Sequence, residues 1–270
     1  MRRIVVKLGG SALTNTSMRS DLVRQIAQLS RDSELIVVHG GGAQIASMLS
    51  RLQIPSKFHD GLRVTDAETR DVAQMVLAGK VGKDLVADLA REGVPAVSIA
   101  GGDGLSFLAE RMSAQDGTDL GYVGKIVESN SDLIDALLKA GIVPLVSCIA
   151  LGATDREYYN INGDQMAAAV AATCHANQLI FVTDVGAVRD GRGADIPVLG
   201  IDGIRRLLAS EVATGGMRPK LRACLEAIES AVGKISIVGG SVENSILRAA
   251  ASDDVGTVIE ASFGANANTQ

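Results

Sequence analysis

The sequence has no tryptophan, and aromatic residues make up only 3% of its 270 residues. Its core must therefore be built from branched and small aliphatic side chains, which is typical of buried parallel sheets. Cysteine is also scarce, since only Cys148, Cys174 and Cys224 are present. They are far apart and odd in number, which indicates neither a disulfide framework nor a cysteine-based zinc site. Buried thiols in a reducing compartment are expected instead.

Clusters of positive charge and long apolar runs are missing as well. The net charge is −5 with no block of Lys or Arg, so we expect no nucleic-acid partner. No apolar stretch approaches the roughly 20 residues that span a bilayer, and the run that begins at Ile4 is too short for a signal peptide. We therefore expect a cytoplasmic protein with one continuous domain over residues 1–260. A disordered tail is predicted over residues 261–270.

Short β-branched runs alternate with helical patterns, which predicts an α/β fold around a mostly parallel sheet. Strands are predicted over residues 4–8, 35–38, 94–99, 142–147, 179–183, 234–238 and 257–259. One helix is predicted from residue 21 with Ser20 as its cap, and a second follows the glycine run of residues 40–42 and ends near residue 52. A third runs from a capping box at Thr65 to Gly79, and a fourth, which carries residues 81, 85 and 89, ends at Gly93. Further helices are predicted over residues 132–139, 164–174, 202–209 and 217–231. The mixed pattern of residues 105–129 predicts antiparallel hairpins at a sheet edge.

A lysine interrupts the first predicted strand. Lys7 stands among apolar residues just before Gly9 and Gly10. An ammonium buried there is costly unless it meets an anion, and glycines let backbone N–H groups approach phosphate oxygens. The alternative is a lysine on an edge strand that reaches solvent.

A second glycine loop follows the second predicted strand, where three glycines come after His39. Gly41 and Gly42 open a helix whose N-terminus favours anions. Neither loop matches a Walker A or a G-x-G-x-x-G motif, and we expect His39 to be structural. Since both loops follow strands of a parallel sheet, they predict a ligand site at one sheet edge.

Polar residues further along could complete such a site. Arg63 follows a glycine turn and could hold a carboxylate with two parallel hydrogen bonds, although a solvated arginine fits the pattern as well. Asn160 and Asn162 alternate, so they share one side of an extended segment, and Asp164 follows at a helix start. The alternative for this group is an Asx turn with a helix cap.

The last candidate is Lys220, in the first turn of a predicted helix behind Gly215, Gly216 and Met217. A cation is disfavoured at a helix N-terminus unless an anion is nearby. Lys220 is therefore a candidate for phosphate contact, with a surface lysine as the alternative.

Taken in order, these motifs resemble the amino acid kinase family over residues 2–260. The matching stretches are Lys7 to Gly10, His39 to Gly42, Gly61 to Thr65, Asn160 to Asp164, Thr183 to Gly186, and Gly215 to Lys220. The resemblance implies a three-layer αβα sandwich with a central, mainly parallel sheet. It also implies a lobe over about residues 1–175 that binds an acyl amino acid and a lobe over about 176–260 that binds ATP.

The resemblance also assigns roles to residues. Lys7 and Lys220 would stabilise the transferred phosphoryl group, and Asp164 would hold both lysines. The acceptor would be bound by Gly41, Gly42, Arg63, Asn160 and Asn162. The nucleotide would be bound by Gly9, Gly10, Thr183, Asp184, Val185, Gly186, Gly215, Gly216 and Met217, and no residue is assigned as a metal ligand.

The implied reaction is the ATP- and Mg²⁺-dependent phosphorylation of the side-chain carboxylate of N-acetyl-L-glutamate, in arginine biosynthesis. Two alternatives stay open. Residues 242–246 resemble the family's kinases of carrier-protein-linked aminoadipate or glutamate in lysine biosynthesis, and a catalytically silent nucleotide-binding regulator is the other. Arginine-inhibited members of the family carry a helix before the first strand, and only three residues precede residue 4 here. The resemblance therefore implies a homodimer that arginine does not inhibit.

Overall fold

An eight-stranded sheet forms the centre of the computed structural model, which describes residues 1–10, 12–114, 116–210, 212–213, 215–251 and 255–261. The predicted tail lies, apart from its first residue, outside the described part of the chain. The strands of this main sheet are β1 (Arg2–Leu8), β2 (Ser33–His39), β5 (Ala96–Ile99), β8 (Val143–Ser147), β11 (Gln178–Thr183), β12 (Val198–Gly200), β13 (Lys234–Gly239) and β14 (Thr257–Glu260).

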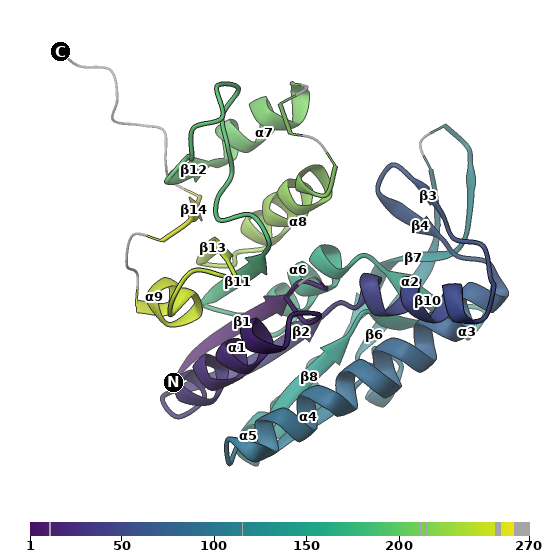
Figure 1. Cartoon of the computed structure of the whole chain (residues 1–270), viewed down its shortest axis with the longest axis horizontal. Helices are drawn as coiled ribbons and strands as arrows, with labels where there is room; N and C mark the ends of the chain where they lie inside the picture. The colour runs from purple at the N-terminus through teal and green to yellow at the C-terminus, as the bar shows by residue number, and fades with distance from the viewer. Residues whose placement is uncertain (11, 115, 211, 214, 252–254, 262–270) are drawn as a thin grey trace.

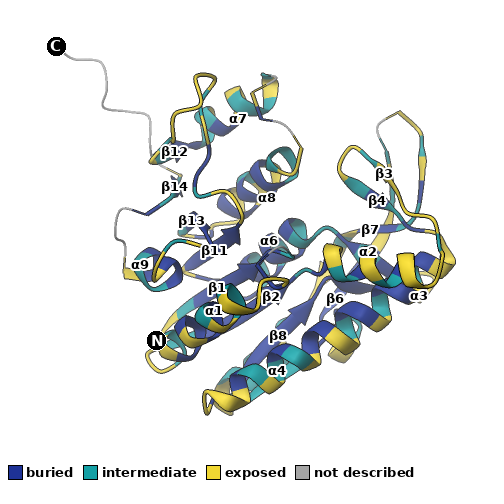
Figure 2. Cartoon of the chain, in the orientation of Figure 1, coloured by how far each residue is buried: buried dark blue, intermediate teal, exposed yellow. Residues whose placement is uncertain are grey.

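The strands are ordered β12-β14-β13-β11-β1-β2-β8-β5, and every neighbouring pair is parallel except β13 and β14. Figure 2 shows that buried residues concentrate in this sheet. In β1, Ile4, Val5 and Val6 are at most 1% exposed, because the strand lies at the centre and is covered on both faces. A strand covered on both faces needs a continuous apolar run, which explains why sequence pattern located these strands well.

Helices cover both faces of the sheet (Figure 1). They are α1 (Thr16–Leu29), α2 (Gly42–Arg51), α3 (Ala67–Gln74), α4 (Gly82–Arg91), α5 (Asp132–Lys139), α6 (Gly163–Thr173), α7 (Ile201–Ala209), α8 (Met217–Glu229) and α9 (Ser245–Ala251). Helix α1 contacts α4 and α9 on one face, while α6 packs on α8 and against β1 on the other. Alanines in α6 allow this close approach. The predicted three-layer αβα sandwich with a mainly parallel sheet is confirmed.

The predicted hairpins lie elsewhere than expected. Strands β6 (Phe107–Ser113) and β7 (Asp119–Ser129) do pair antiparallel, but they close a small barrel with β9 (Ile149–Gly152) and β10 (Tyr158–Ile161). Their placement at an edge of the main sheet was therefore wrong. The strands that close the barrel come later in the sequence, and local pattern could not reveal this pairing.

A short hairpin of β3 (Lys57–His59) and β4 (Leu62–Val64) projects beside the barrel (Figure 1). Its turn residues, Asp60 and Gly61, both have positive φ, 47° and 79°, which is what a two-residue hairpin turn requires. The sequence pattern predicts a turn here but neither strand, since each has only three residues. The short elements β9, β12 and α9 were not predicted either.

Two predicted helix caps were wrong. Helix α1 begins at Thr16 because the side chain of Asn15 accepts a hydrogen bond from the N–H of Met18 at 3.0 Å, so Ser20 lies inside the helix. Helix α3 is capped by Asp66 and not by Thr65, whose hydroxyl donates to the carbonyl of Arg63 at 2.7 Å. Asparagine and aspartate are strong caps, so the upstream Asn15 and the adjacent Asp66 take this role.

Gly79 does not end a helix. It lies in a π-helical stretch, Met75–Val81, which joins α3 to α4. Val76, Leu77 and Val81 of this stretch are buried, so packing against the core stabilises a helix that local signals would have stopped. Within the described residues no helix has the length and apolar character needed to cross a membrane.

Candidate active site

The predicted glycine loops meet at one edge of the main sheet. Strands β2 and β11 flank β1, and in the pairing register Lys7 lies opposite Val38 on one side and Phe181 on the other. The N–H of Gly9 donates to Val182 at 3.1 Å, so the loop after β1 continues the strand pairing. The ends of the three strands therefore bring their loops together, as expected for a parallel sheet.

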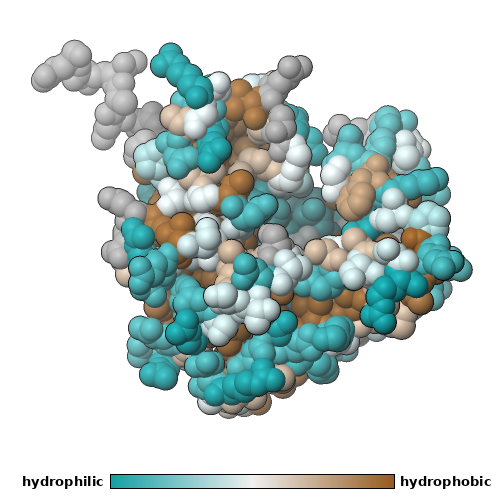
Figure 3. All heavy atoms as spheres, viewed as in Figure 1, coloured by the Kyte–Doolittle hydropathy of each residue, from teal (hydrophilic) through white to brown (hydrophobic). Residues whose placement is uncertain are grey.

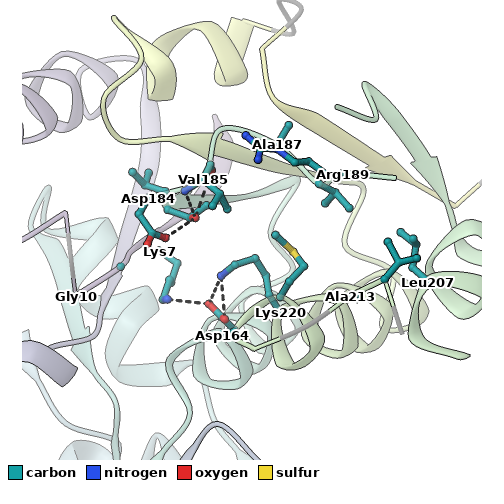
Figure 4. Close-up of a pocket in the computed structure, with 17 residues that line it drawn as sticks. Lys7, Gly10, Asp164, Asp184, Val185, Ala187, Arg189, Leu207, Ala213 and Lys220 are labelled. Atoms are coloured by element: carbon teal, nitrogen blue, oxygen red, sulfur yellow. Dashed lines mark hydrogen bonds and ion pairs between the residues drawn. The ribbon is translucent and has the colours of Figure 1, made fainter. Parts of the chain in front are cut away.

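Two lysines share one carboxylate at this edge (Figure 4). The ammonium of Lys7, from β1, lies 2.7 Å from Oδ1 of Asp164 at the start of α6. The ammonium of Lys220, from the first turn of α8, donates to both oxygens of the same carboxylate at 2.9 Å. Asn162 caps α6 by accepting hydrogen bonds from the N–H groups of Asp164 and Gln165, which fixes the aspartate in place.

The three residues are all less than a tenth exposed, so their charges interact strongly. Burial would raise the pKa of Asp164, but the two ammonium groups outweigh it and lower that pKa from 3.8 to about 2. Burial opposes the charge on Lys7 as well, yet Asp164 raises the pKa of Lys7 above its ordinary value. Burial and the charge of Lys7 together lower the pKa of Lys220. With both lysines protonated, the two ammonium groups carry one positive charge more than the carboxylate of Asp164 neutralises.

A cavity of about 540 Å³ opens on one side of this cluster. We call it the larger cavity. Aliphatic side chains such as Val182 and Val188 form part of its walls, and Leu207 from α7 lies across from the loop after β11 in Figure 4. Of the predicted nucleotide residues, the larger cavity is lined by Gly9, Gly10, Thr183, Asp184, Val185, Gly216 and Met217.

Gly186 and Gly215 were also predicted there, but neither is among the residues that line the larger cavity. Gly186 packs on the backbone around Gly239, where a Cβ on Gly239 would lie 3.1 Å from its Cα. Gly215 borders a separate cavity next to Arg218. Sequence motifs did not reveal Arg189 and Leu207, which do line the larger cavity. Leu207 lies on an amphipathic helix and has the pattern of an ordinary core residue.

A smaller cavity of about 210 Å³ lies on the other side of Lys7. All five predicted acceptor residues line it, namely Gly41, Gly42, Arg63, Asn160 and Asn162. It also contains Phe58, Leu77 and Cys148, which sequence motifs did not indicate. In Figure 3 this face of the molecule is hollowed between the β3–β4 hairpin and the helices α7 and α8.

Of the residues that the structure describes, Lys7 and Gly10 line both cavities. An atom placed beside the ammonium of Lys7 can therefore be approached from either side. The two cavities thus adjoin, with Lys7 at the junction.

Arg63 is the notable cation of the smaller cavity. Arg63 is only 8% exposed. Its guanidinium donates hydrogen bonds to the carbonyl of Gly42 at 2.9 Å and to the hydroxyl of Ser56. It lies 4.6 Å from the ring centre of Phe58. Among the described residues no carboxylate forms an ion pair with Arg63. A buried, unneutralised guanidinium in a cavity is suited to binding an anionic ligand.

His39 lines neither cavity. It is fully buried, and burial lowers its pKa to about 4, so the ring is neutral at pH 7. Its Nδ1 lies 3.2 Å from the carbonyl oxygen of Gly40, which supports the loop after β2.

Comparisons with known proteins agree with this arrangement. The sequence model of the amino acid kinase family matches residues 2–239. Acetylglutamate kinases of Acidobacterium capsulatum and Koribacter versatilis are 47% and 44% identical to the chain over 237 residues, which cover 87% of this chain and 90% of each relative. The crystal structure of smu.665 from Streptococcus mutans UA159 superposes with a TM-score of 0.81 at 26% identity, covering 96% of this chain and 99% of that one. The chain belongs to the amino acid kinase family.

Proposed function

We propose that this protein is a kinase that transfers the γ-phosphoryl group of ATP to the side-chain carboxylate of N-acetyl-L-glutamate. The products are N-acetyl-L-glutamyl 5-phosphate and ADP, a step of arginine biosynthesis. The acetylglutamate kinases named above support this function, and they span nearly the whole chain. They favour neither of the two alternatives, the carrier-linked substrate and the silent regulator.

The cluster of Lys7, Asp164 and Lys220 is the observation that carries the proposal. Two buried ammonium groups share one carboxylate at the junction of the two cavities. The remaining positive charge lies where a phosphoryl group would pass from one cavity to the other. Phosphoryl transfer depends on positioning and on stabilising charge at the phosphoryl oxygens, and this cluster provides both.

The acceptor needs no general base. A glutamate side chain has an ordinary pKa of about 4.3, so it is ionised at pH 7 and is already a nucleophile. The neutral, buried His39 outside both cavities is consistent with such a reaction.

We assign the two ligands to the two cavities. In this assignment ATP occupies the larger cavity, with its base among the aliphatic walls and its phosphates at Gly9, Gly10 and Lys220. N-acetyl-L-glutamate occupies the smaller cavity, with its α-carboxylate on Arg63 and its acyl group near Asn160. The lobe over about residues 1–175 would then bind the acceptor and the lobe over about 176–260 the nucleotide.

Mg²⁺ fits this site as a companion of the nucleotide. In the described part of the chain no group of three or more His, Cys, Asp or Glu side chains could hold a metal ion, and Asp164 is neutralised by its two lysines. We therefore propose that ATP phosphates and water hold the ion, as Mg²⁺ prefers. When bound, it would neutralise charge on the phosphates.

The direct test is ADP release measured with ATP, Mg²⁺ and N-acetyl-L-glutamate. Activity should require all three, and N-acetyl-L-aspartate, one methylene shorter, should be a much poorer acceptor because its carboxylate falls short of Lys7. Equal or greater activity with a carrier-linked acyl amino acid would contradict the assignment. Light scattering tests the homodimer that we propose for the same protein, with twice the 27.9 kDa chain mass expected.

Arg63→Lys should raise KM for N-acetyl-L-glutamate about tenfold or more, since a charge-assisted hydrogen bond contributes about 1.5–3 kcal/mol. Lysine keeps the charge but lacks the planar fork. KM for ATP should change little. The matched control is Arg70→Lys, because Arg70 also stacks on an aromatic ring, 4.4 Å from Tyr122, but lines neither cavity. Equal rises in both KM values would contradict a carboxylate-binding role.

A further inference from the structure

Gly163, the first residue of α6, is a glycine in a place where helix propensity favours alanine. Its φ is not in the left-handed region, so its backbone does not require glycine. In helix interiors glycine is less favourable than alanine by about 1 kcal/mol. The space around Gly163, in contrast, restricts a side chain.

That space is occupied on two sides. A Cβ on Gly163 would lie 3.2 Å from Cε of Lys7, 3.6 Å from its Nζ, and 3.4 Å from Sγ of Cys148. The closest of these contacts is tighter than most Cβ atoms experience, so at least one neighbour would have to move. Residue 163 is thus wedged between a sulfur atom and the lysine at the junction of the two cavities.

The two neighbours differ in how freely they can move. Cys148 is 2% exposed, and its thiol donates a hydrogen bond to the carbonyl of His39 at 3.1 Å. Its sulfur is therefore fixed in the core. The ammonium of Lys7 is held 2.7 Å from Asp164, and a displaced Cε would change this contact. Because Lys7 is restrained only at its ends, in β1 and at Asp164, it is the neighbour that would shift.

We propose that Gly163 and Cys148 are a size-matched pair that positions Lys7 for phosphoryl transfer. The missing side chain at 163 gives room to the sulfur on one side and to the lysine methylene on the other. Gly163 is a positioning residue, since it acts through Lys7. The inference rests on the proposed function, because it assigns Lys7 to the transfer step.

Gly163→Ala should lower kcat about tenfold, since displacing a reacting group by about 1 Å costs up to 100-fold and the shift here is smaller. The KM for ATP should change much less than kcat, because the walls of the larger cavity are untouched. Gly163 lines the smaller cavity, so a rise in the KM for N-acetyl-L-glutamate would report the new methyl group there and not the position of Lys7. A matched control is Gly79→Ala, where a new Cβ meets nothing within 4 Å and no cavity is lined. This control should keep wild-type kcat.

The second variant is Cys148→Ser, which retains a donor for the His39 carbonyl but has a smaller atom on a shorter bond. Combined with Gly163→Ala, it should restore most of the lost kcat, because residue 163 can then move toward position 148. Such non-additivity is the mark of two residues in contact. If Gly163→Ala alone does not fold, a folded and active double variant supports the same crowding.

The outcomes separate the inference from the proposed function. A wild-type protein that releases no ADP overturns both. An active wild type with an equally active Gly163→Ala variant overturns the positioning role of Gly163 alone. A slow single variant that Cys148→Ser does not rescue overturns the size-matched pair, as does a double variant that fails to fold.

Discussion

Lys7→Met is expected to lower kcat by about 100-fold or more, the usual loss when a preorganised group that stabilises transition-state charge is removed. Among the described residues Lys7 is the one side chain that lines both cavities, so its charge at the junction is not replaced by another of them. Methionine fills a similar volume within β1 but has no charge.

The same substitution should leave the protein at least as stable as the wild type. Asp164 would still accept two hydrogen bonds from Lys220, and the cluster would become neutral. A buried ammonium that lacks a full counter-charge is costly, so its removal offsets the lost ion pair.

Steady-state kinetics checks the expected loss of kcat in Lys7→Met, and urea unfolding checks its expected stability. Lys234→Met is the matched control, because Lys234 also lies in a strand of the main sheet but lines neither cavity. Near wild-type turnover in Lys7→Met would remove Lys7 from the mechanism. A large loss of stability would show that the excess charge is compensated in some other way.

Asp164→Asn should have the opposite effect on stability, lowering the free energy of unfolding by about 3 kcal/mol or more. The amide has no charge, so two buried ammonium groups would face each other without a carboxylate. Turnover should fall too, because the lysines would no longer be held in position. Inorganic phosphate should stabilise the variant more than the wild type, since an anion can replace the missing charge.

The pH dependence gives this prediction a second signature. In the wild type, the pKa of Asp164 is about 2 in the folded protein and 3.8 in the unfolded chain. Asp164 therefore contributes stability above pH 3.8 that is lost as pH falls toward 2. In the variant a buried lysine should lose its proton easily, so stability is regained as pH rises toward the ordinary lysine pKa of about 10.4. The difference between the two proteins should therefore be largest near neutral pH.

Asp132→Asn is the control for this pair of experiments. Asp132 also lies in the first turn of a helix, α5, but it is exposed. Urea melts of both variants across pH give the comparison. Equal stability of Asp164→Asn and Asp132→Asn at neutral pH would contradict the role of Asp164 as counter-ion to both lysines.

The sequence by itself determined the layers of the fold and the parts of the site that depend on local pattern. Buried parallel strands are continuous apolar runs, so β1, β2, β8 and β11 could be located by composition alone. A lysine among apolar residues and glycines at strand ends are local signals too. Their positions at the ends of parallel strands were enough to expect one shared site.

Only the tertiary structure decided how these residues meet. Lys7, Asp164 and Lys220 come from three separate elements, so no local pattern shows that one carboxylate serves both lysines, which only the family resemblance implied. The barrel around β9 and β10, the continuous helix through Gly79 and the place of Leu207 in the larger cavity were likewise invisible. The physical reason is the same for each: pairing register and side-chain packing join segments distant in sequence, while periodicity and propensity report only on neighbours along the chain.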